Sequence, residues 1–208
     1  MDVARPHAVI VNDLDAEVLR VLATANSAMN ARQIWRIAGR GSEKGIRTAA
    51  QRLDRLGVIT ASRVGASDIY VLNDEHLAAA AIRALAGMRG ALIDRIRRAV
   101  GDWKRTPVNV SLFGSAARGD GDAQSDIDVL VVRSDAVGRD DETWRRQLDD
   151  LSSQILRWTG NHAGLLELSE REIRAAGRRD GHRPLDELRR DAIDIAGSNV
   201  RQILRNPR

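Results

Sequence analysis

Cysteine is absent from this sequence of 208 residues, which excludes disulfide scaffolds and thiolate metal sites. Long apolar runs are absent too: none approaches the ~18 residues of a membrane-spanning helix, and the N-terminus lacks the pattern of a signal peptide. We therefore expect a cytoplasmic protein with no membrane partner. Hydrophobic residues make up 43% of the chain, which is enough for a packed core and argues against extensive disorder.

Lysine is scarce: only two of the 33 basic residues are lysines, and the formal net charge is +4. This positive charge is unevenly distributed. Residues 32–63 carry eight Lys or Arg against two acidic residues, whereas residues 107–208 carry sixteen against eighteen. Clustered basic residues favour a polyanionic partner, so we expect such a partner to bind the first part of the chain.

The first part of the chain contains the patterns of three helices followed by a hairpin. Apolar residues recur at helical spacing in the first and third helices, and Ser42 can cap the third. The third helix is basic on its polar side, and Gly65 lies in the loop between the two strands. The expected helices span residues 13–25, 30–37 and 43–56, and the expected strands span 58–60 and 69–72.

Segment Ser42–Asn73 (SEKGIRTAAQRLDRLGVITASRVGASDIYVLN) resembles winged helix-turn-helix regulators of bacteria. The resemblance implies that the third helix enters the major groove of double-stranded DNA and that the hairpin contacts the backbone or the minor groove. In this interpretation Arg47, Thr48, Gln51 and Arg52 face base edges, while Lys44, Arg55 and Arg63 contact phosphates. The alternative is a winged helix used for protein contact or dimerisation.

Residues 76–103 have the pattern of one long helix without proline. Gly87 and Gly90 lower its helix propensity and are candidate positions for a bend. We interpret this segment as a linker helix between two domains. Its apolar side could also join two copies of the chain into a homodimer.

The strongest functional signal is the string Phe113–Asp128 (FGSAARGDGDAQSDID), which lies between expected strands at 108–113 and 127–132. Residues two apart on a strand point to the same side, so Asp126 and Asp128 place two carboxylates together. Such paired carboxylates suit Mg²⁺ or Mn²⁺, which prefer oxygen ligands. The Gly114-Ser115 turn offers backbone N–H groups to a phosphate.

This string resembles the minimal nucleotidyltransferases of the DNA polymerase β superfamily, whose signature is Gly-Ser-x₁₀-Asp-x-Asp. The resemblance implies a mixed sheet flanked by helices and an NTP substrate, with ATP expected. It also implies a metal held by Asp126 and Asp128, which promotes in-line attack of a hydroxyl on the α-phosphorus. The acceptor would be a protein, a tRNA end or a small molecule, and some relatives act with a cognate toxin. The residues expected to bind the nucleotide are Gly114, Ser115, Arg118 and Ser125.

The family has a third carboxylate on a later strand, and the candidate strand here is 163–168. The family position falls on Gly164, and Glu167 follows three residues later. Because a three-residue shift reverses the side faced, Glu167 can serve as the catalytic third carboxylate only if a bulge or a different register intervenes. The alternative function is therefore a non-catalytic transcriptional regulator whose second domain binds nucleotide or dimerises.

These patterns together predict an α/β protein of two domains. We expect a winged helix-turn-helix domain over residues 1–75, the linker helix over 76–106, and a nucleotidyltransferase-like domain over 107–208. Beyond the strands already named, we expect a helix over 149–160, a short helix over 184–190 and a last strand over 192–196.

Overall fold

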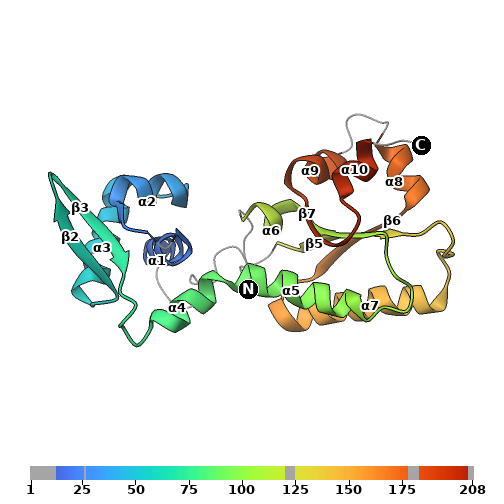
Figure 1. The fold of residues 1–208 in the computed structure, drawn as a ribbon, viewed down its shortest axis with the longest axis horizontal. Helices are drawn as coiled ribbons and strands as arrows, with labels where there is room; N and C mark the ends of the chain where they lie inside the picture. Colours follow the sequence, from blue (N-terminus) through green and yellow to red (C-terminus); the bar gives the residue numbers. More distant parts are fainter. Residues whose placement is uncertain (1–12, 26, 120–124, 178–182, 206–208) are drawn as a thin grey trace. The chain divides into compact units, whose positions relative to one another are not determined.

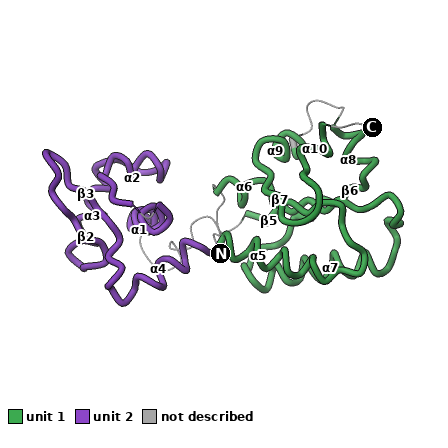
Figure 2. Tube along the Cα trace, viewed as in Figure 1, with its two compact units in different colours: residues 1–4, 89–208 green, residues 5–88 purple. Residues whose placement is uncertain are grey.

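The computed structural model describes residues 13–25, 27–119, 125–177 and 183–205 of this mixed α/β protein. The described residues form two compact units that divide between Met88 and Arg89 (Figure 2). Residues 120–124, which belong to the string that precedes Asp126, lie outside the described residues. In the part of the chain that the structure covers, no helix has both the length and the apolar character needed to cross a membrane.

The N-terminal unit contains helices and a small antiparallel sheet (Figure 1). The sheet has the strand order β1-β3-β2, and the β2–β3 hairpin turns through Gly65, whose φ is 58°. Ser42 caps α3 by accepting a hydrogen bond from the Gly45 backbone N–H, as expected. The three predicted helices and the hairpin are confirmed, whereas the short strand β1 was not predicted. The elements are α1 (Asp13–Ala25), β1 (Met29–Asn30), α2 (Ala31–Ala38), α3 (Glu43–Arg55), β2 (Ile59–Val64), β3 (Ser67–Leu72) and α4 (Ala79–Ala86).

The single helix predicted over residues 76–103 is wrong, because the structure divides it at Gly87 into α4 and α5 (Met88–Gly101). Ile82 of α4 packs in the core of the N-terminal unit. Ile96 of α5 packs in the core of the C-terminal unit. Each half thus belongs to a different hydrophobic core, and glycine, a poor helix former, occupies the position between them.

The C-terminal unit is built on a mixed four-stranded sheet with the order β6-β5-β4-β7. Strands β5 and β6 are parallel, and the other neighbouring pairs are antiparallel. The predicted mixed sheet flanked by helices is confirmed. Helix α7 begins earlier than expected, because the Asp141 carboxylate caps it by accepting a hydrogen bond from the Trp144 backbone N–H. The elements after α5 are β4 (Asn109–Leu112), α6 (Gly114–Arg118), β5 (Ile127–Arg133), α7 (Glu142–Thr159), β6 (Ala163–Ser169), α8 (Glu170–Ala176), α9 (Arg183–Asp191), β7 (Ile193–Gly197) and α10 (Val200–Arg205).

Helices cover both faces of this sheet (Figure 1). Helices α5 and α7 pack on the face to which Val129 and Val131 of β5 point. Helices α8, α9 and α10 pack on the opposite face, together with Leu130 and Val132. Because side chains alternate along a strand, Asp128 at the start of β5 lies on the same face as Leu130 and Val132.

Candidate active site

The carboxylate of Asp128 lies between two glycines. Gly114 follows β4 with φ of 67°, and a Cβ added there would lie 2.3 Å from Asp128 Oδ2. On the other side, the β5–β6 register pairs Asp128 with Gly164, where an added Cβ would lie 2.7 Å from Asp128 Oδ1. Real Cβ atoms do not approach an oxygen so closely, so both positions require glycine while Asp128 keeps this conformation.

Asp126 lies beside this arrangement, because the same added Cβ on Gly164 would lie 3.8 Å from Asp126 Cβ. Asp126 is exposed, whereas Asp128 is half-buried. The backbone before β5 is fixed by the Asn161 side-chain amide, which donates a hydrogen bond of 3.0 Å to the Ser125 carbonyl. The structure therefore brings Asp126, Asp128 and the Gly114 turn together.

Burial is the largest cause that raises the pKa of Asp128, followed by the negative charges of Asp126 and Glu187. The positive charge of Arg118 acts in the opposite direction. Burial and nearby negative charges both disfavour the ionised form of a carboxyl group. In the described part of the chain, no three Asp, Glu, His or Cys side chains are grouped to hold a metal ion. The two aspartates are nevertheless oxygen donors of the kind that Mg²⁺ and Mn²⁺ accept, so they fit a metal whose remaining ligands come from phosphate and water.

Arg118 connects α6 to α9 through an ion pair, in which its Nη1 lies 3.2 Å from Asp191 Oδ2. A hydrogen bond from Arg190 is the largest cause that lowers the pKa of Asp191, and Arg118 contributes to the same shift. Glu187 lies four residues before Asp191 on α9, a spacing that places both side chains on one face of a helix. Glu187 was not predicted as a site residue; it lies within the helix expected over 184–190, but Asp191 lies one residue beyond that range, so the shared face was not visible in the sequence.

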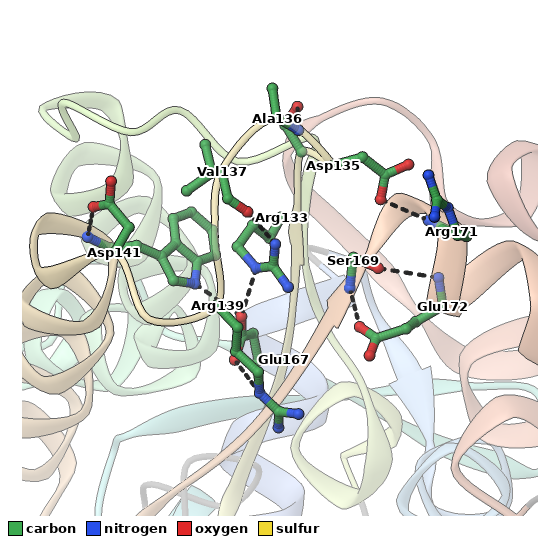
Figure 3. A network of polar contacts seen from close by, with 12 residues as sticks. Arg133, Asp135, Ala136, Val137, Arg139, Asp141, Glu167, Ser169, Arg171 and Glu172 are labelled. Carbon is green, nitrogen blue, oxygen red and sulfur yellow. Dashed lines mark hydrogen bonds and ion pairs between the residues drawn. The ribbon is translucent and has the colours of Figure 1, made fainter.

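Glu167 does not reach the two aspartates. Its Oε1 accepts hydrogen bonds from Arg133 Nε at 2.9 Å and from Trp144 Nε1 at 3.0 Å, and Arg139 is nearby (Figure 3). The β5–β6 register runs without a shift from the Ile127–Ala163 pair to the Arg133–Ser169 pair, so Glu167 lies on the opposite face of the sheet from Asp128. The bulge required for a catalytic Glu167 is not present, and that expectation is corrected here.

The N-terminal unit exposes most of the residues predicted to bind DNA. Arg47 pairs with Glu43 at 2.6 Å, and Arg63 pairs with Asp68 at 2.9 Å, and both ion pairs are exposed. Arg52 differs, because its Nε and Nη2 bind the Asp15 carboxylate on α1 at 3.1 and 2.5 Å. Arg52 therefore joins α3 to α1, which corrects the expectation that it points toward base edges. The other predicted residues are all exposed on α3: Lys44, Thr48, Gln51 and Arg55.

Comparison with known proteins gives a match to a family model described as a nucleotidyltransferase domain, over residues 93–204. This range covers more than half of the chain and contains the Gly114 turn, both aspartates, Gly164 and α9. No family is assigned to the helices of the N-terminal unit. No curated protein and no solved structure matches the chain.

Proposed function

This chain belongs to the nucleotidyltransferase domain family, and from this premise we propose that it transfers a nucleoside monophosphate from an NTP to a hydroxyl acceptor. The observation that carries the proposal is the close packing of Asp128 between Gly114 and Gly164, with Asp126 beside it. A triphosphate bound at the Gly114-Ser115 turn would lie next to two carboxylates. Phosphoryl transfer depends mainly on positioning and on charge neutralisation, which this arrangement provides.

Each residue has a distinct role in this proposal. Asp126 and Asp128 would hold the metal, while Gly114 and Ser115 would hold the triphosphate. A bound Mg²⁺ or Mn²⁺ would neutralise charge on the phosphates. The acceptor oxygen forms a bond to the α-phosphorus, the bond to the β-phosphate oxygen breaks, and pyrophosphate leaves.

The hydroxyl proton requires an acceptor, and Glu167 is on the wrong face. We assign this role to Glu187, because the Arg118–Asp191 ion pair holds α9 against α6 and the Glu187 charge acts on Asp128. The positive charge of Arg118 would stabilise the phosphates from the same side. The third acidic group would thus come from a helix and not from β6.

The decisive experiment measures pyrophosphate release and ATP binding on the same samples, with Mg²⁺ or Mn²⁺ present. The Asp126→Asn, Asp128→Asn double variant should lose metal-dependent ATP binding and all transfer. Asp149→Asn is the matched control, because Asp149 is exposed on α7. Unchanged Mn²⁺-dependent ATP binding in the double variant would refute the proposed site.

The Glu187→Gln variant separates the enzyme from the non-catalytic alternative. If Glu187 accepts the proton, this variant should retain ATP binding and lose at least about a hundredfold in transfer rate, as expected when a general base is removed. The absence of transfer in the wild-type protein, with ATP binding intact, would instead favour a regulator whose second domain binds nucleotide. Gly164, where the family has a carboxylate, favours that alternative.

A second proposed function is binding of double-stranded DNA by the N-terminal unit, in the manner of a winged helix-turn-helix domain. The supporting observation is the exposed basic side of α3, together with Arg63 on the hairpin. Such binding would suit a regulator of its own synthesis, including one that acts with a cognate toxin. A band-shift experiment with duplexes from the upstream region of the gene tests it, and a failure to bind any duplex would refute it.

A further inference from the structure

Strand β6 forms one edge of the four-stranded sheet, and its outer side has no strand partner among the described residues. Its ladder partner is β5, which lies on its inner side. The Ile127 N–H donates a hydrogen bond to the His162 carbonyl, so the even-numbered residues of β6 direct their backbone groups toward β5. The backbone N–H and C=O groups of Ala163, Leu165 and Glu167 therefore point outward, and no described residue bonds to them.

This edge lacks the features that commonly protect an open strand. Exposed edge strands attract other chains, and lysine, proline or a bulge in the strand usually prevents such pairing. Strand β6 contains neither lysine nor proline, and its register with β5 is regular. Its one charged side chain, Glu167, is held by Arg133 and Trp144 on the face of the sheet that α7 covers. The edge can therefore accept a further strand.

An apolar cavity of about 360 Å³ lies between β6, α8 and α9. Of the sheet, only β6 contributes to its lining, through Leu166 and Leu168, which places the cavity toward the open edge and on the Asp128 face. The one charged lining residue, Glu172, already accepts a hydrogen bond from the Ser169 N–H. The cavity therefore suits an apolar side chain. Its other lining residues are Ala175, Ala176, Pro184 and Leu185.

An extended polypeptide is complementary to both features. Its backbone would pair with the outward groups of β6, and every second side chain would point to the side of the sheet that α8 and α9 cover. Recognition by strand addition combines the same two elements, because main-chain hydrogen bonds provide affinity and a pocket for an alternate side chain provides specificity. The edge and the cavity thus point to one kind of partner.

The row of side chains that lines the cavity leads to the candidate active site. Gly164 lies two residues before Leu166, about 7 Å along the strand, and pairs with Asp128. It has no side chain to separate an added strand from the Asp128 carboxylate. The Gly114 turn follows β4, which lies on the other side of β5. A residue added beside Gly164 would thus approach from the side opposite the proposed triphosphate, as in-line attack requires.

We propose that the open edge of β6 binds an extended segment of a protein by strand addition, and that this protein is the hydroxyl acceptor. An apolar side chain of the segment occupies the cavity, and a hydroxyl-bearing residue two or four positions away lies beside Gly164. Its oxygen bonds to the α-phosphorus, pyrophosphate leaves with the electrons of the broken P–O bond, and the hydroxyl proton passes to Glu187. The acceptor assignment rests on the proposed function, whereas strand addition does not.

The test uses the full-length protein, with a phage-displayed library of random ten-residue peptides as the probe. Peptides selected on the wild type are synthesised, and their affinities are measured by fluorescence anisotropy. Each peptide is also made with single N-methylated residues, which remove one backbone N–H at a time. Ala175→Leu fills the cavity from α8, and Ser153→Leu is the matched control, because Ser153 is exposed on α7 outside the cavity lining.

We expect N-methylation at every second residue to weaken binding by at least about tenfold and at the intervening residues to have little effect, because only alternate N–H groups of an added strand face β6. Ala175→Leu should weaken binding by a similar factor, and Ser153→Leu should not. The Asp126→Asn, Asp128→Asn protein should bind the peptides as the wild type does. Peptides with a hydroxyl two or four residues from the apolar side chain should accept labelled nucleotide from ATP with the wild type only.

Strand addition is overturned if no peptide is selected, or if the N-methyl effects do not alternate and both leucine variants bind equally well. The acceptor assignment is overturned if bound peptides stay unlabelled while pyrophosphate is released with another hydroxyl acceptor. A dimer that sedimentation detects and that Ala175→Leu abolishes would overturn it too, because a second copy would then occupy the edge. Absence of pyrophosphate release with every acceptor refutes the proposed transfer and the acceptor assignment together, while the peptide affinities still decide strand addition.

Discussion

Replacing Gly164 with alanine tests the packing around Asp128 directly. The added Cβ would lie 2.7 Å from Asp128 Oδ1, which is closer than real contacts allow. The contacted atom is an outer oxygen of the Asp128 side chain, and the other oxygen, Oδ2, lies against Gly114. The side chain of Asp128 must therefore leave its position, or the parallel pairing of β5 and β6 must open.

Forcing extra carbon into a well-packed site costs about 1–3 kcal/mol. We expect Gly164→Ala to destabilise the C-terminal unit by this amount and to weaken Mn²⁺-dependent ATP binding, because Asp128 is displaced. Urea unfolding followed by tryptophan fluorescence reports on this unit, since it contains Trp103, Trp144 and Trp158. Gly138→Ala is the matched control, because an added Cβ there meets no atom within 4 Å.

The aspartate variant at the same position is more informative about function. Gly164→Asp supplies the carboxylate that the resemblance implies at this position, and from the sequence alone it would be expected to raise any transfer rate. The structure predicts a lower transfer rate instead, because the added Cβ contacts Asp128 Oδ1 and the new carboxylate places a third negative charge next to Asp126 and Asp128. A Gly164→Ala protein as stable as Gly138→Ala, with unchanged ATP affinity, would refute this reasoning. A faster Gly164→Asp enzyme would refute it as well.

Three further predictions concern other parts of the molecule. Because the pKa of Asp128 is raised in the folded protein, its contribution to stability is present at low pH and is lost as the pH rises through the folded pKa. Asp128→Asn should therefore be more stable than wild type at neutral pH. Denaturant unfolding should show no such difference below pH 3.8, the ordinary pKa of the group. Glu167→Gln should destabilise the C-terminal unit by about 3 kcal/mol, because it leaves a buried Arg133 without its ion-pair partner. Calorimetry should give an unchanged ATP affinity for this variant. Loss of ATP binding without loss of stability would contradict the position of Glu167 on the face of the sheet opposite Asp128. Arg47→Ala should lower affinity for a specific duplex by about 1–3 kcal/mol. Arg63→Ala should instead weaken binding to all duplex sequences and reduce the salt dependence of binding. If salt titrations by fluorescence anisotropy gave equal effects of both variants on every duplex, they would argue against sequence-specific DNA recognition by α3.

The strands around the candidate site could be predicted because the two-residue period of a strand constrains them strongly. Alternation in β5 placed Asp126 and Asp128 on one side, and the register of β6 places Gly164 opposite Asp128 as the family spacing implied. The same alternation predicts that Glu167, three residues after Gly164, faces away from Asp128 unless a bulge intervenes, and the β5–β6 register contains no such bulge. Local periodicity was sufficient here because each of these relations involves one strand or two adjacent strands.

Contacts between distant segments could not be predicted in this way. Arg52 has the position of a base-reading residue on the polar side of α3, but its partner Asp15 is 37 residues away in α1. The break falls at Gly87, one of the two expected bend positions, but helix periodicity does not indicate that α4 and α5 join different cores. The early start of α7 has a local signal in the sequence, because Asp141 is a favourable capping residue.

The packing of Asp128 also bears on the origin of the third acidic group in the proposed mechanism. With Asp128 held between two glycines, a side chain at residue 164 would have to displace the Asp128 carboxylate. In the proposed mechanism the third acidic group comes from another element, and α9 is the helix that Arg118 joins to α6. Glu187 on that helix already raises the pKa of Asp128, so its charge reaches the site. In this proposal the glycine on β6 and the acidic residue on α9 are two aspects of one arrangement, in which α9 supplies the charge that β6 lacks.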